Sequence, residues 1–231
     1  MKKRTQSPCP SSRETVSGFC YLAFQLLLLP SLLYFINGNL SQPLKEAELN
    51  FVYYLTNFIA MLVIFHDFLS RSLSQAFQHP IVLCEAVILG FVAYYACFHV
   101  SDRLVSLLVP SFSNYNDEAI FEMSRGNSFL MLIGTVILVP PFEECLFRGL
   151  IFRSLYGKSR WVAYTVSILA FAMVHILGFW GSYSPLEILF AVLQYLPAGL
   201  CLAWSYAKAG NIFAPILIHA AVNYITVNGL R

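Results

Sequence analysis

The chain has 231 residues, of which 58% are hydrophobic, 16% aromatic and only 11% charged. Ordinary soluble domains are about 45–50% apolar and about 25% charged, so this composition excludes a disordered chain, a collagen-like fibre and a disulfide-rich scaffold. A formal net charge of only +2, with no basic stripe, argues against nucleic acid as a partner. We therefore expect an integral, multi-pass membrane protein surrounded by a lipid bilayer.

A transmembrane helix needs roughly 20 mostly apolar residues to cross about 30 Å of hydrocarbon. Seven runs approach this length, and the segment Arg103–Phe112, which extends or breaks the third run, widens the range to six to eight spans. The pattern predicts an all-α, polytopic helix bundle of about seven spans, at Val16–Ile36, Phe51–Leu69, Pro80–Val100, Phe129–Phe152, Trp161–Trp180, Pro185–Ala207 and Asn211–Val227.

The basic residues are divided unevenly between alternate loops. Cytoplasmic loops of membrane proteins carry an excess of lysine and arginine, so the side with more of them faces the cytoplasm. This rule predicts a cytoplasmic N-terminus, with the basic residues of that side being Lys2, Lys3, Arg4, Arg13, Arg71, Arg153, Lys158, Arg160 and Lys208. The opposite side keeps Lys45, Arg103, Arg125 and Arg231.

The polar residues divide the chain into two parts. Residues 1–127 are expected to form N-terminal transmembrane helices and a polar connector, and residues 128–231 to form a second set of helices that carries the motifs described below. The connector, Ser111–Asn127, is the longest polar stretch between spans. A plain connector is the favoured interpretation, with a short interfacial helix or a gating loop as the alternatives.

Three apolar runs of the second part contain polar side chains near mid-membrane depth. Ionisable groups there cost on the order of 2.5–3.5 kcal/mol each on insertion scales, so each needs a reason. The polar side chains are Glu143, Glu144 and Arg148 in the fourth run, His175 of the motif Phe171-x-x-x-His175 in the fifth, and His219 and Asn223 of the motif His219-x-x-x-Asn223 in the seventh. Because their depths are similar, we expect the three sets to converge in a polar cavity within the membrane.

Helical geometry separates the two glutamates. Glu144 and Arg148 lie four residues apart on one face, with the acid N-terminal, which favours an ion pair. Glu143 points about 100° away and need not share that arginine. Pro140 and Pro141 precede both acids, and because proline removes a backbone donor we expect a kink or break there, opening a helix N-terminus or a water pocket beside Glu143.

This set of residues has the chemistry needed to hydrolyse a peptide bond. A carboxylate with an imidazole can activate water, and a second histidine with an asparagine amide can stabilise the oxyanion. Two histidines and a carboxylate also satisfy zinc, so a metal site at Glu143, His175 and His219 stays an alternative. A proton- or ion-coupled carrier that uses the same groups as a relay is another.

The motifs E-E-x-x-x-R, F-x-x-x-H and H-x-x-x-N, in that order on three apolar runs, resemble the CPBP intramembrane proteases. This family contains the Ras-converting CAAX endopeptidase and the bacterial Abi proteins. The resemblance covers Phe129–Arg231. It implies that Glu143 activates water with help from His175, that His219 and Asn223 form an oxyanion hole, and that Glu144, Arg148 and Phe171 support the site. It also implies a mechanism without metal or other cofactor.

The resemblance implies an intramembrane endopeptidase that acts on a membrane-embedded or lipidated protein or peptide. Comparison with the Ras-converting enzyme suggests release of the last three residues of a prenylated protein. The short basic leader and compact bundle resemble the bacterial members more than the eukaryotic ones, so a bacterial plasma membrane is expected. A non-catalytic bacteriocin-immunity or binding protein with a degenerate site remains an alternative. The sequence leaves substrate and oligomeric state open.

Overall fold

The computed structural model describes residues 7–228, and these residues form helices and loops without a β-strand. The prediction of an all-α fold is therefore confirmed. In chain order the helices are α1 (Ser12–Leu27), α2 (Leu29–Gly38), α3 (Glu46–Ile64), α4 (His66–Gln78), α5 (Pro80–Leu108), α6 (Tyr115–Gly126), α7 (Ser128–Leu132), η1 (Ile133–Leu138), α8 (Val139–Glu144), η2 (Cys145–Phe152), α9 (Arg153–Tyr156), α10 (Arg160–Leu177), α11 (Pro185–Ala209) and α12 (Phe213–Val227).

The candidate membrane spans agree roughly with the predicted number of about seven. Five helical segments are long and apolar enough to cross a bilayer, namely α3, α5, the continuous run from α7 to α9, α10 and α11. Helices α1 and α2, bent by 47° at their junction, form a sixth candidate, and α12 is a shorter apolar helix of 15 residues. Helix α5 continues to Leu108, so residues 103–108 lengthen the third span and do not start a new one.

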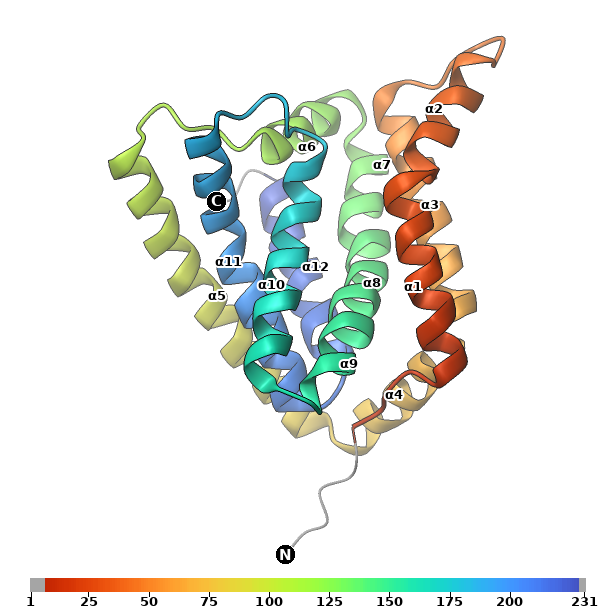
Figure 1. The fold of residues 1–231 in the computed structure, drawn as a ribbon, viewed down its shortest axis with the longest axis vertical. Coiled ribbons are helices and arrows are strands. Elements are labelled where there is room, and N and C mark those ends of the chain that lie inside the picture. The colour runs from red at the N-terminus through yellow and green to blue at the C-terminus, as the bar shows by residue number, and fades with distance from the viewer. Residues whose placement is uncertain (1–6, 229–231) are drawn as a thin grey trace, which may run out of the picture.

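The two parts of the chain pack into one bundle (Figure 1). Helix α5 packs along α11 and α12, and α3 packs against α8. Gly90 of α5 makes a close approach possible, because a Cβ there would lie 2.6 Å from the side chain of Ile218 and 3.1 Å from that of Ser205. Small residues allow membrane helices to approach closely in this way. The division at residues 127 and 128 stays a prediction.

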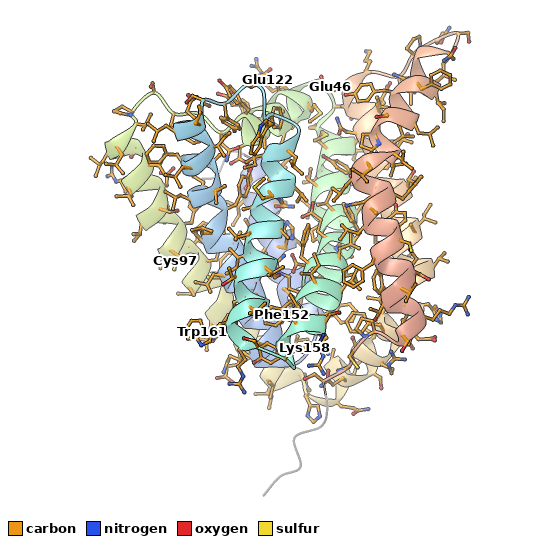
Figure 2. The ribbon with its side chains drawn as sticks, in the orientation of Figure 1. Glu46, Cys97, Glu122, Phe152, Lys158 and Trp161 are labelled. Atoms are coloured by element: carbon orange, nitrogen blue, oxygen red, sulfur yellow. The ribbon has the colours of Figure 1, made fainter. Side chains whose placement is uncertain are left out.

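The two ends of the bundle differ in charge. Helices α4 and α9 lie at the end near the N-terminus, and α6 lies at the opposite end (Figure 1). Figure 2 shows Lys158 at the first end, with Glu46 and Glu122 at the second. Arg13, Arg71, Arg153, Arg160 and Lys208 also belong to the first end. Of the residues used to predict orientation, Lys2, Lys3, Arg4 and Arg231 lie outside the described residues.

The segment expected to be a plain connector contains a helix. Helix α6 begins after Asn114, whose side-chain oxygen accepts hydrogen bonds from the backbone N–H groups of Asn116 and Asp117. This N-cap satisfies donors that otherwise have no partner in the first turn. The interpretation as a plain connector is therefore wrong, and the segment places a short helix across one end of the bundle (Figure 1).

Candidate active site

The glutamate pair lies near the middle of a continuous helix of 29 residues, Ser128–Tyr156. At a rise of 1.5 Å per residue, Glu143 is roughly 20 Å from each end of this helix. Of the expected kink or break at Pro140 and Pro141, the break is wrong, because the chain stays helical through both prolines, and the kink stays a prediction. Wider π-type turns before and after them change the hydrogen-bond register, and such turns often occur at functional sites.

The Glu144 carboxylate is fully buried and has two partners on the same oxygen. Arg148 Nη1 donates to Glu144 Oε1 over 2.9 Å, the pair that the four-residue spacing predicts. His219 Nδ1 lies 2.9 Å from that oxygen. Arg148 is also fully buried, and its Nη2 donates to the Gly199 carbonyl over 3.2 Å. Buried charges are tolerated when they are paired and hydrogen-bonded, so these contacts tie α12 and α11 to the glutamate helix.

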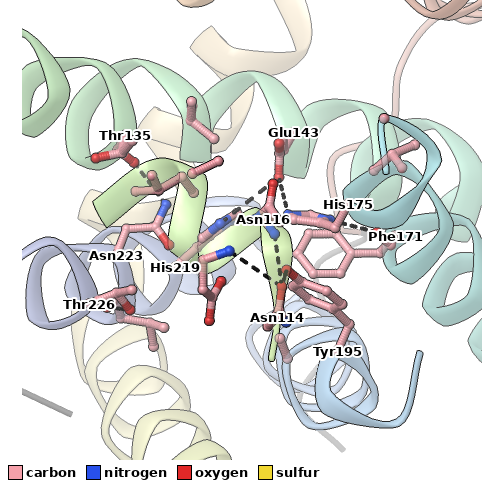
Figure 3. Close-up of a pocket in the computed structure, with 18 of the residues that line it drawn as sticks. Asn114, Asn116, Thr135, Glu143, Phe171, His175, Tyr195, His219, Asn223 and Thr226 are labelled. Carbon is pink, nitrogen blue, oxygen red and sulfur yellow. Dashed lines mark hydrogen bonds and ion pairs between the residues drawn. The ribbon is translucent and has the colours of Figure 1, made fainter. Parts of the chain in front are cut away.

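Glu143 lies between two imidazole rings (Figure 3). Its Oε2 is 3.9 Å from Nε2 of His175 and 3.9 Å from Nε2 of His219, and has no hydrogen-bond partner among the described residues. His175 Nδ1 lies 2.7 Å from the Phe171 carbonyl oxygen. A carbonyl can only accept, so Nδ1 carries the proton, and in the neutral ring Nε2 presents its lone pair toward Glu143.

Asn223 is held by a backbone carbonyl of the glutamate helix. Its Nδ2 donates to the Thr135 carbonyl oxygen over 2.8 Å, and Figure 3 shows the two residues side by side. The Val139 N–H bonds to the Gly134 carbonyl, five residues back. With the same spacing of five residues, the Thr135 carbonyl would accept a hydrogen bond from the backbone N–H of residue 140. Residue 140 is a proline, which has no N–H. Pro140 therefore leaves the Thr135 carbonyl open, and the Asn223 amide occupies it.

Phe171 packs between the charged and imidazole groups of the site. The Arg148 guanidinium carbon lies 4.4 Å from the centroid of its ring, a cation–π contact. The ring centroid is 4.5 Å from that of His175 and 5.8 Å from that of His219. The aromatic ring thus fixes the positions of three other side chains, which fits the supporting role expected of it.

A cavity of about 780 Å³ joins these groups. Glu143, His175, His219 and Asn223 all line it, whereas Glu144 and Arg148 lie behind its wall. The structure thus brings together the four residues predicted to be catalytic and keeps the ion pair apart from them. Their chemical roles stay predictions.

Sequence patterns missed several polar residues of this cavity. The Tyr195 hydroxyl donates to Asn114 Oδ1 over 3.2 Å, and Asn114 Nδ2 donates to Gln194 Oε1 over 2.9 Å. These bonds attach the start of α6 to α11. An asparagine directly before a helical pattern is a typical N-cap, which is the signal that could have marked Asn114. The only signal in the sequence for the Thr135 carbonyl is that Pro140, which lacks an N–H, follows Thr135 by five residues.

A metal centre was the alternative for three of these residues. Within residues 7–228, no group of three or more His, Cys, Asp and Glu side chains has the arrangement of a metal site. This arrangement of side chains does not test whether the reaction uses a metal, so the expected mechanism without metal stays a prediction.

Comparison with known proteins identifies the segment that carries the site. Residues 125–225 match the family model described as type II CAAX prenyl endopeptidase Rce1-like. All three motifs, from Glu143 to Asn223, fall inside this match. The resemblance seen in the motifs is thereby confirmed over the second part of the chain.

Curated relatives share parts of the chain. The UPF0177 protein YxdF of Lactococcus lactis is 34% identical over 87 residues, which is 38% of this chain and 42% of the relative. The putative membrane peptidase YdiL of Bacillus subtilis is 31% identical over 113 residues, 48% of this chain and 41% of the relative. The UPF0177 protein YbdI of L. lactis is 24% identical over 149 residues, which is 61% of this chain and 73% of the relative.

The matches with YxdF and YdiL thus span about two fifths of each relative's length. No solved structure matches the chain significantly. Residues 125–225 are therefore similar to CAAX prenyl endopeptidases of the Rce1-like type, and the apolar helices indicate a membrane protein.

Proposed function

We propose that this chain, whose residues 125–225 belong to the Rce1-like family of CAAX prenyl endopeptidases, is an intramembrane endopeptidase that cleaves a membrane-embedded or lipidated protein or peptide. One observation carries the proposal. Glu143 presents a carboxylate oxygen without a hydrogen-bond partner among the described residues, between two imidazole rings on the wall of a cavity at mid-membrane depth.

In this mechanism Glu143 is the general base. It takes a proton from a water molecule while the water oxygen attacks the substrate carbonyl carbon, and it later gives that proton to the leaving amine nitrogen as the C–N bond breaks. His175 assists because its Nε2 lone pair faces the same point and can orient the water by accepting its second hydrogen. The separation of 3.9 Å is typical of unliganded sites, whose catalytic contacts shorten only with substrate.

His219 and Asn223 stabilise the oxyanion that forms on the carbonyl oxygen. Asn223 gives one amide hydrogen to the Thr135 carbonyl and keeps the other for the substrate. His219 donates from Nδ1 to Glu144, so it can donate from Nε2 only when both ring nitrogens carry protons. The Glu144 carboxylate, which also accepts a hydrogen bond from Arg148, stabilises that imidazolium. Each donor of this kind contributes about 10²–10³ in kcat.

Orientation follows from the charges of the two ends. We place the end with α4 and α9 in the cytoplasm of a bacterial cell, because the excess of lysine and arginine lies there. The proposed chemistry uses only side chains of this chain, without zinc.

The test compares cells or proteoliposomes that carry the wild type, Glu143→Gln or Glu85→Gln. Glu85 pairs with Lys208 on the surface of the bundle and does not line the cavity, so its variant is the matched control. Mass spectrometry of new N-termini in the membrane fraction should reveal fragments present with the wild type and Glu85→Gln and absent with Glu143→Gln. Identical fragments in all three samples, from folded proteins present in equal amounts, would contradict the proposal.

A further inference from the structure

The His175 ring is held within its own helix by Phe171, one turn earlier in α10. The Phe171 carbonyl oxygen lies 2.7 Å from His175 Nδ1, and the centroids of the two rings are 4.5 Å apart. The second side-chain torsion of histidine has broad preferences, so the local rotamer does not select one orientation of the ring. A turn of the ring moves Nε2, which faces Glu143 over 3.9 Å. The proposed mechanism therefore needs a further contact that fixes this orientation.

Tyr195 of α11 supplies such a contact from a second helix. Its ring centroid lies 4.6 Å from that of His175, with 32° between the ring planes (Figure 3). This distance falls in the range of about 4.5–7 Å at which aromatic rings attract each other. Helix α11 packs along α10, so the contact joins two elements of the bundle. A His175 ring that turns away from Glu143 has to give up its place against Tyr195.

The Tyr195 ring is itself anchored at its far end. Its hydroxyl donates to Asn114 Oδ1 over 3.2 Å, and the Asn114 amide donates to Gln194 Oε1 over 2.9 Å. Two consecutive residues of α11 are thus bound to one side chain. The same Asn114 oxygen caps the first turn of α6. A tyrosine that is bonded at its hydroxyl and packed at its ring gives His175 a fixed surface to pack against.

The hydrogen bond to Asn114 also indicates how Tyr195 acts. Tyr195 lines the cavity, but its hydroxyl has a single hydrogen, which is given to Asn114. That hydrogen does not serve as a third donor to the oxyanion, whose proposed donors are His219 and Asn223. The contact that links Tyr195 to the chemistry is its ring against His175.

We propose that Tyr195 is a positioning residue, whose ring holds His175 with Nε2 toward Glu143 and whose hydroxyl bond to Asn114 holds that ring in place. This deepens the proposed function and rests on it, because the orientation matters for hydrolysis only if His175 orients the attacking water. It also makes turnover depend on how the start of α6 is seated against α11.

The first experiment observes the His175 ring without substrate. Protein labelled with ¹³C in its five histidine rings is studied by NMR in detergent, and the signal missing from His175→Gln assigns His175. Ring currents displace the proton signals of a stacked imidazole. Tyr195→Leu should move the His175 signals toward those of an unstacked histidine, whereas Tyr195→Phe, which keeps the ring, should preserve most of the displacement. His175 signals that stay unchanged in Tyr195→Leu would overturn the inference.

The second experiment measures cleavage of an internally quenched farnesylated peptide in liposomes, per amount of folded protein. A misplacement of about 1 Å can cost about 10² in rate, so we expect kcat of Tyr195→Leu to fall about 10²-fold with KM nearly unchanged. Tyr195→Phe should lose up to about tenfold, the equivalent of one neutral hydrogen bond. A rise in KM at constant kcat would assign Tyr195 to substrate binding and overturn the positioning role.

Tyr183→Phe is the matched control. The Tyr183 hydroxyl accepts from the Tyr115 N–H over 2.9 Å, so it also binds the start of α6. Its ring contacts those of Phe112 and Tyr115, and Tyr183 is not among the described residues that line the cavity. We expect its kcat per folded protein to equal that of the wild type. A loss as large as that of Tyr195→Phe would assign the effect to α6 alone and contradict the inference.

A double-mutant cycle tests whether Tyr195 acts through His175. In a His175→Gln background, which retains Glu143 and the oxyanion donors, Tyr195→Leu should cause little further loss of kcat, because the ring that it positions is gone. The full loss in that background would overturn the positioning role. Cleavage that is equal in Glu143→Gln and wild type would overturn the proposed function instead, whereas the NMR signals would still decide whether Tyr195 orients His175.

Discussion

His219 and Glu144 share a buried contact of 2.9 Å between Nδ1 and Oε1, across 75 residues of sequence. The same ring places Nε2 3.9 Å from Glu143, so one histidine contacts both members of the glutamate pair. Its motif neighbour Asn223 turns instead to the Thr135 carbonyl. The two residues of one motif are therefore held by different anchors, and each anchor can be tested separately.

Replacing Glu144 by glutamine tests the buried ion pair. The substitution keeps the shape but removes the charge that neutralises Arg148 and His219. Breaking a buried pair by removing one partner costs about 3–5 kcal/mol, because the other charge stays buried. We expect the unfolding temperature in detergent to fall. We also expect the activity per amount of folded protein to fall, so that unfolding alone does not account for the lost activity.

The double substitution Glu144→Gln with Arg148→Met controls for the stranded charge. It should regain stability relative to Glu144→Gln, because no unpaired arginine remains, but it should not regain activity. Activity that recovers together with stability would show that Glu144 acts on the fold alone.

Replacing Pro140 by alanine tests how Asn223 is positioned. The new N–H can pair with the Thr135 carbonyl and compete with the Asn223 amide. We expect kcat to fall, with a loss bounded by the about 10²–10³ that one oxyanion donor contributes, while KM stays constant. Stability should stay equal or rise, because alanine favours a helix interior over proline.

Pro141→Ala is the matched control for this variant. It removes the adjacent proline, but with the same spacing of five residues its new N–H faces the carbonyl of residue 136. The Thr135 carbonyl therefore stays bonded to the Asn223 amide. Equal losses of kcat in the two variants would contradict the positioning role.

Replacing Gly199 by alanine tests the close contact between α10 and α11. A Cβ at Gly199 would lie 2.9 Å from Cγ2 and 3.2 Å from Cα of Ile168, so α11 has to shift. Overpacking of this kind costs about 1–3 kcal/mol, and the shift also moves the carbonyl that Arg148 binds. Thermal unfolding should show the loss, whereas Gly126→Ala, which has nothing within 4 Å, should not destabilise the protein.

Chelation tests the metal-free mechanism. Dialysis of the purified protein against EDTA should leave peptide cleavage unchanged, and elemental analysis of the active protein should find substoichiometric zinc. The opposite result, activity that EDTA abolishes and zinc restores at one ion per chain, would overturn the metal-free mechanism and favour the alternative of a zinc site at Glu143, His175 and His219.

Several features of the site followed from local sequence because helical geometry alone determines them. Glu144 and Arg148 meet because residues four apart share a helix face. The order of the three motifs also sufficed to identify the family that residues 125–225 match. The break expected at Pro140 and Pro141 was wrong because propensity rules consider one helix in isolation. In the protein, wide turns and the Asn223 amide compensate for the donors that the prolines lack.

The sequence by itself determined that this chain is a membrane helix bundle with a polar site, because hydropathy over 20 residues and the cost of buried charge are local quantities. Only the tertiary structure decided that His219 joins the pair of Glu144 and Arg148 and that Glu143 lines the cavity. It also placed Tyr195 against His175. These relations join residues far apart in sequence, so they depend on how helices pack, which no single segment encodes.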